Sequence, residues 1–118
     1  MIGDLNGSII WTADVARLVP FYRDTLGQKM TMESDGFVMF GDGRLAVGQH
    51  SEVKGAARDP YRIMLSFDTT DAQADYDDLI GKGVEFTQAP YASGTLMIAT
   101  FKDPDGNILQ LLQRNPVS

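Results

Sequence analysis

The spacing of apolar residues predicts alternating strands and helices along the chain. β-branched and aromatic residues at positions 8–12 predict a strand, and Asp14 follows as a residue that can cap a helix. Apolar residues at helical spacing then predict a helix that exits at Gly27, with a kink or local restart at Pro20, which lacks an amide hydrogen. Three short strands follow, separated by glycine-containing turns, at residues 29–33, 36–40 and 44–49. The first half is therefore predicted to have the order βαβββ.

The second half repeats this order. A polar stretch without periodicity occupies residues 51–61 and reads as a connector. Beyond it the pattern predicts a strand, a helix capped by Asp71 and closed by Gly81 and Gly83, and three more strands. The four strands are expected at residues 62–69, 84–87, 95–102 and 108–113.

The two capping aspartates, Asp14 and Asp71, are related by an offset of 57 residues. The same offset aligns apolar positions in the strand before each cap and in the helix after it. A shared offset across three elements predicts an internal duplication. We therefore predict one domain over residues 1–118, with βαβββ modules at residues 7–50 and 62–114 and a connector at residues 51–61.

Composition limits the class of partner. The sequence has no cysteine, which excludes a disulfide scaffold and a thiolate metal site and suits a reducing compartment. It has no basic leader followed by an apolar run, and no long apolar segment. Sixteen acidic against ten basic residues give a net charge of -6, which disfavours nucleic acid and anionic membranes. We expect a cytoplasmic protein that binds a small molecule, neither nucleic acid nor membrane.

Two stretches carry a family resemblance. Residues 103–106, Asp-Pro-Asp-Gly, predict a tight turn before the apolar strand at residues 108–113, which alone indicates only a β-hairpin. Residues 20–27, Pro-Phe-Tyr-Arg-Asp-Thr-Leu-Gly, stand at the end of the first helical pattern. Together they resemble the vicinal-oxygen-chelate superfamily of glyoxalase, bleomycin-resistance and extradiol dioxygenase proteins. The resemblance implies an α+β fold in which two βαβββ modules form a curved mixed-sheet cup with the helices outside. Each half should expose a sheet edge that a partner must cover, and the family covers it either within one chain or by exchanging modules between two chains. We expect a homodimer.

The resemblance also implies where a metal would bind. Metal-dependent members carry ligands on the concave side of the first and last strands of each module. Those positions read Gly7, Ala46 (or Val47, one residue along), Met64 and Gln110 in this chain. Glycine and alanine offer no ligand atom, and a thioether is a poor ligand for hard divalent ions. We therefore expect no metal site of the family type and no cofactor.

Side-chain alternation along a strand then suggests what the cup contains. If Ile10 and Thr12 face the helix, Trp11 faces the cup, and the duplication places Asp68 at the equivalent position. The candidate ligand-binding residues are Trp11, His50, Met64, Ser66, Asp68 and Gln110. Three of them have a structural alternative: Trp11 and Met64 as core fillers, and His50 as a solvated residue at a strand end. His50 and Asp68 are weak candidates for a catalytic role. The sequence has one histidine, which cannot by itself build a metal-binding triad.

Three functions remain open. The leading one is a metal-independent protein that binds, and sequesters, an aromatic or cationic small molecule, similar to the bleomycin-resistance branch. The alternative is a lyase, isomerase or dioxygenase-like enzyme with a degenerate or unusual metal site. The third is a structural or regulatory subunit whose cup is filled by its own side chains. No nucleophile elbow, phosphate-binding loop or zinc-protease signature competes with these.

Overall fold

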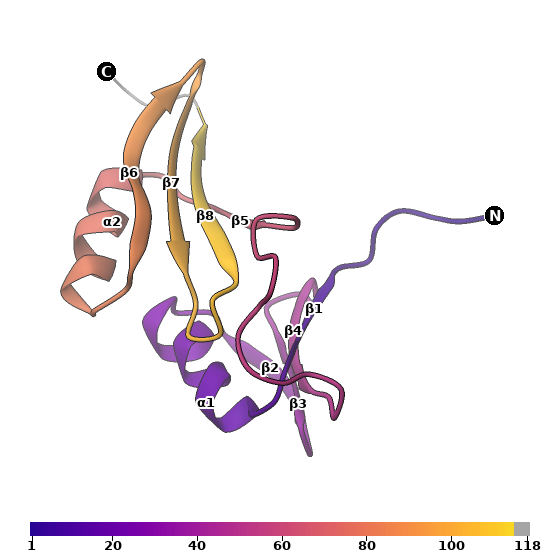
Figure 1. Ribbon diagram of the computed structural model, residues 1–118. Coiled ribbons are helices and arrows are strands. Elements are labelled where there is room, and N and C mark those ends of the chain that lie inside the picture. The colour runs from indigo at the N-terminus through magenta and orange to yellow at the C-terminus, as the bar shows by residue number, and fades with distance from the viewer. Residues whose placement is uncertain (115–118) are drawn as a thin grey trace. The chain divides into compact units, whose positions relative to one another are not determined.

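The computed structural model describes residues 1–114 of the chain. They form two compact units, Met1–Gly55 and a second that begins at Ala56. Each unit holds one βαβββ module, with a four-stranded mixed sheet and one helical segment (Figure 1). The predicted α+β class with two modules is confirmed. Within residues 1–114, no helix has the length and apolar character needed to cross a bilayer.

The first unit contains β1 (Ser8–Thr12), α1 (Val15–Pro20), η1 (Phe21–Thr25), β2 (Met30–Ser34), β3 (Phe37–Phe40) and β4 (Leu45–Gln49). The sheet order is β1-β4-β3-β2, with β1 and β4 parallel and the other neighbours antiparallel. The parallel pair arises because the helix and the two-strand hairpin intervene between β1 and β4. One sheet face packs against α1 and η1. The buried side chains of this layer include Leu18, Val19 and Tyr22 from the helical segment, and Val38, Phe40 and Val47 from the sheet.

Pro20 has the predicted effect on the first helix. The α-helix ends at Pro20, whose ring nitrogen cannot donate a hydrogen bond, and the chain continues as one wider π-type turn. In that turn the Leu26 amide donates to the Phe21 carbonyl at 2.9 Å, and Gly27 exits with φ 74°. The wider turn keeps Tyr22 fully buried against the sheet.

The second unit contains β5 (Leu65–Asp68), α2 (Ala72–Gly81), β6 (Phe86–Ser93), β7 (Leu96–Lys102) and β8 (Ile108–Arg114), in the sheet order β5-β8-β7-β6. β5 begins at Leu65, three residues later than predicted. β6 extends to Ser93, well beyond the predicted end at residue 87. β6 is an edge strand with two register shifts, which is where a sheet tolerates a proline such as Pro90.

Both helices begin with the same capping arrangement. The Asp14 carboxylate accepts from the Ala16 amide at 3.0 Å, and the Asp71 carboxylate accepts from the Ala74 amide at 3.0 Å. Before each cap a threonine hydroxyl accepts from the aspartate amide: Thr12 at 3.2 Å and Thr69 at 3.1 Å. These bonds satisfy amides that a helix start leaves free. The repeated geometry supports the predicted duplication.

A second, unpredicted cap comes from the last strand of each module. The Gln49 side-chain oxygen accepts from the Val15 amide at 3.3 Å, and the Gln113 oxygen accepts from the Ala72 amide at 2.8 Å. Because the glutamine stands beside the end of the first strand, it joins sheet and helix at one point. The same link in both modules shows that they share tertiary as well as local structure.

The turn between β7 and β8 is organised by one buried carboxylate. Asp103 accepts from the amides of Asp105 and Asn107, each at 2.9 Å, and from the Asn107 side-chain amide at 2.8 Å. Its own amide donates to the Asn107 carbonyl at 3.0 Å, and Gly106 takes φ 81°. The predicted tight turn is confirmed, and its aspartate is 4% exposed.

Replacement of Asp103 by alanine is predicted to lower the free energy of unfolding by about 2–3 kcal/mol, because buried amides lose a charged acceptor. Chemical denaturation measures the change. The matched control is Asp42→Ala, an exposed turn aspartate that accepts from the Arg44 amide at 3.2 Å, for which the loss should be about 0.5 kcal/mol. Equal losses in the two variants would contradict this account of the turn.

Candidate functional site

The first sheet has one face packed on the helix and one open face. Along β1, Ile10 and Thr12 lie on the helix side, whereas Ile9 and Trp11 alternate to the other side and remain 48% and 41% exposed. The parallel register places Ala46 beside Ile9 and Gly48 beside Trp11. The open face of the first sheet therefore carries Trp11, as side-chain alternation predicts.

Trp11 is held in a small aromatic cluster, which we define as Trp11, Phe37 and His50 around Gly48. The indole ring lies 6.1 Å from the Phe37 ring and 5.4 Å from the His50 ring, centroid to centroid, the latter edge-on. A Cβ atom at position 48 would lie 2.5 Å from Cζ3 of Trp11, so the benzo ring occupies the space that a side chain would fill. Trp11 is thus positioned by its neighbours and remains partly exposed.

The surroundings of the aromatic cluster on the same face are apolar. Met39 pairs with Ala46, and Met32 pairs with Met39 on the next strand and is 41% exposed. Methionine side chains adapt their shape to what they contact. The open face therefore offers a deformable apolar surface beside an exposed indole.

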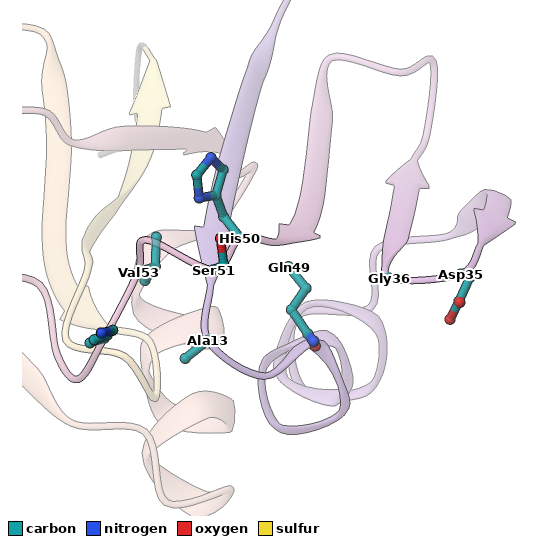
Figure 2. Close-up of a pocket in the computed structure, with 8 residues that line it drawn as sticks. Ala13, Asp35, Gly36, Gln49, His50, Ser51 and Val53 are labelled. Atoms are coloured by element: carbon teal, nitrogen blue, oxygen red, sulfur yellow. The ribbon is translucent and has the colours of Figure 1, made fainter.

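His50 directly follows β4 and is anchored by hydrogen bonds on both sides. Its amide donates to the Thr12 carbonyl at 3.1 Å, and its Nδ1 accepts from the Glu52 amide at 3.0 Å. Figure 2 shows the imidazole and the Gln49 side chain extending in opposite directions from the backbone. His50 therefore belongs to the open face, while Gln49 belongs to the helix face.

A pocket of about 490 Å³ lies within the first unit, between the β2–β3 turn and the segment after β4 (Figure 2). Its lining consists of Ala13, Asp35, Gly36, Gln49, His50, Ser51, Val53 and Lys54. Of the candidates named from sequence, only His50 lines it. Sequence reasoning passed over Asp35, Ser51 and Lys54 because they stand in a turn and a connector, where no periodicity marks a face.

The second unit has a more polar open face. The Gln110 side-chain amide donates to the Ser66 hydroxyl at 2.6 Å, across the parallel β5–β8 pair. Asp68 lies two residues after Ser66 on β5. Its carboxylate is 4.0 Å from the Arg114 guanidinium, and both side chains are well exposed. Met64 lies just before β5 and is 38% exposed. The structure thus brings together Ser66 with Gln110 in this unit, and Trp11 with His50 in the other.

The residues at the family's metal positions do not fit a divalent ion. Gly7 has a packing role, because a Cβ atom there would lie 2.5 Å from the Arg44 carbonyl oxygen. Ala46 is buried beneath its neighbours and has no donor atom. Met64 supplies a thioether, which is a poor ligand for hard cations, and the single amide oxygen of Gln110 cannot hold an ion alone. Across residues 1–114 no three His, Cys, Asp or Glu side chains gather in a way that could hold a metal.

Three comparisons with known proteins bear on this arrangement. The chain is 42% identical over 48 residues to the uncharacterized protein YurT of Bacillus subtilis, covering 41% of this chain but only 38% of YurT. It is 27% identical over 115 residues to the uncharacterized protein YraH of the same organism, covering 83% of this chain and 88% of YraH. The crystal structure of TnmS3, an antibiotic binding protein from Streptomyces sp. CB03234, has the same fold, with a TM-score of 0.75 at 21% identity over 96% of this chain and 97% of that one.

A family model covers nearly the whole chain. It matches residues 5–111, which include both modules, both helix caps and the Asp103 turn. Each of the two units described above has the βαβββ order that the sequence resemblance implied. This chain belongs to the Glyoxalase/Bleomycin resistance protein/Dioxygenase superfamily.

Proposed function

We propose that this protein binds a small planar or cationic molecule at the open face that carries Trp11, without using a divalent metal. The observation that carries the proposal is the indole itself, 41% exposed and held over Gly48 on an apolar sheet face. A tryptophan that only filled the core would be largely buried, whereas Trp11 leaves 41% of its surface available for contact. Stacking or cation-π contact with such a ring is worth about 0.5–2 kcal/mol.

Polar groups are available to orient the ligand. On the first unit the His50 imidazole lies beside the indole, with 5.4 Å between the ring centroids. The second unit carries a separate set of polar groups on its own open face, the Asp68 carboxylate and the Ser66–Gln110 pair, and the proposed Trp11 site does not depend on them. An apolar surface with a few fixed polar groups is the usual composition of a small-molecule site.

Metal independence is supported by the chemistry of the residues that stand at the family's metal positions. Neither Gly7 nor Ala46 carries a donor atom, and the close approach of Arg44 at Gly7 excludes a larger residue there. The binding role has a precedent in the same fold, since TnmS3 is an antibiotic binding protein. Sequestration of an aromatic compound in the cytoplasm is therefore the form of binding that we propose.

We also infer that the protein acts as a homodimer. Within its own sheet β1 is an edge strand, as is β5, and an uncovered edge favours pairing with another strand. Light scattering should then give a mass of about twice the 12.9 kDa of one chain at micromolar concentration. A single-chain mass that stays constant with concentration would contradict the dimer.

Replacement of Trp11 by alanine should weaken binding of planar aromatic and cationic compounds about tenfold, because the stacking surface is lost. Thermal-shift screening followed by calorimetry on the hits measures the change. Trp11→Phe should retain part of the affinity, and the control Tyr61→Ala, at an exposed aromatic residue in the connector, should retain all of it. Unchanged affinities in Trp11→Ala would refute the proposal.

Treatment of the protein with a metal chelator should leave both the unfolding temperature and the ligand affinity unchanged. The residues at the positions that the family resemblance assigns to metal ligands do not fit a divalent ion. Elemental analysis of the purified protein should find zinc, nickel, manganese and iron far below one atom per chain. A stoichiometric metal that is lost together with ligand binding would instead favour the lyase, isomerase or dioxygenase-like alternative.

A further inference from the structure

We propose that Gly48 and His50 select the ligand that binds at Trp11 on the open face of the first sheet. This site binds a neutral planar heterocycle with an in-plane hydrogen-bond acceptor in preference to a cation of the same shape. This inference rests on the proposed binding function and goes further, because it chooses between the two ligand classes that the exposed indole alone allows. Gly48 sets the position of the stacking surface, and His50 sets which atom the ligand must present.

Gly48 is a positioning residue for the indole. The nearest atoms to a Cβ at position 48 would be Cζ3 of Trp11 at 2.5 Å, Cε3 of Trp11 at 2.8 Å and Cδ2 of Phe37 at 3.0 Å. Both tryptophan atoms belong to the benzo ring, so this ring rests directly on the glycine backbone. Any side chain at position 48 would have to displace it, because contacts of that length are not tolerated. The absent side chain therefore lets the benzo ring lie against the backbone of Gly48, while 41% of the tryptophan remains exposed to a ligand.

His50 supplies a donor of fixed direction. In the neutral imidazole one ring nitrogen carries a proton and the other accepts. Since Nδ1 accepts from the Glu52 amide at 3.0 Å, the proton is on Nε2, and Nε2 has no hydrogen-bond partner among residues 1–114. The imidazole lies edge-on to the indole, with 75° between the ring planes and 5.4 Å between the centroids. The Nε2–H group is thus a donor without a partner on a ring that lies beside the indole.

The donor and the stacking surface together define a ligand class. A planar ring system stacked on Trp11 can direct a lone pair in its own plane toward the imidazole, where Nε2–H donates. Ring nitrogens and ring carbonyls present such lone pairs. A quaternary aromatic cation has the same shape but no lone pair, and it would meet a donor hydrogen. The two kinds of ligand can therefore be separated by experiment.

The test uses isoquinoline and N-methylisoquinolinium, two water-soluble probes of nearly equal shape, at a mildly alkaline pH where isoquinoline is uncharged. Trp11 is the only tryptophan, so its indole N–H cross-peak in a ¹⁵N correlation spectrum reports on this face alone. We expect isoquinoline to shift the cross-peak and to bind at least fivefold more tightly than the cation, as one hydrogen bond would provide.

Two variants separate the roles of the residues. His50→Asn keeps an acceptor for the Glu52 amide but removes the Nε2–H donor, so isoquinoline should weaken about fivefold while the cation changes less than twofold. Gly48→Ala displaces the indole, so both probes should weaken about tenfold. The matched control is Gly81→Ala, where a Cβ meets no atom within 4 Å, and it should bind both probes like the wild type. If Gly48→Ala does not fold, His50→Asn still decides the question.

The outcomes distinguish this inference from the function on which it rests. Equal affinity of the two probes, or tighter binding of the cation, would overturn the inference and leave the binding function standing. An isoquinoline affinity that His50→Asn does not reduce would do the same. No shift of the indole cross-peak with either probe would count against both.

Discussion

The structure depends on the parallel pairing of the first and last strands in each module. Once β1 pairs with β4 and β5 with β8, the register decides which side chains contact the helix and which stay open. A shift of one residue would bury Trp11 under α1 and expose Ile10. A glutamine in the last strand of each module, Gln49 at the end of β4 and Gln113 one residue before the end of β8, ties this register to the helix start, at Val15 and at Ala72. Register and helix position are therefore fixed together.

Much of this organisation could be predicted from sequence because its causes are local. The caps at Asp14 and Asp71 and the turn at Asp103 could be predicted from residue type alone. Pro20 interrupts its helix whatever the helix packs against. The glutamine caps could not be predicted, because their partners lie 34 and 41 residues away. The length of β6 was missed because Pro90 disfavours a strand unless the strand lies at an edge.

The two open faces differ in chemistry although the modules share one plan. The first carries the aromatic cluster and methionines, and the second carries hydroxyl, amide and charged groups. The position held by Trp11 beside Gly48 is held by Asp68 beside Leu112 in the second module. Alternation places these residues on their faces, but it does not reveal that Trp11 contacts His50, which follows from the chain leaving β4. The two modules thus share one plan of strands and helix, and single positions on their open faces differ in chemistry.

A crystal structure of the protein with isoquinoline bound, with anomalous data to identify any metal, tests the central claim most directly. The account predicts the ring stacked on the exposed face of Trp11, its nitrogen within hydrogen-bonding distance of His50 Nε2, and no ion at Gly7, Ala46, Met64 or Gln110. A ligand bound elsewhere, or a divalent ion held at those four positions, would contradict it.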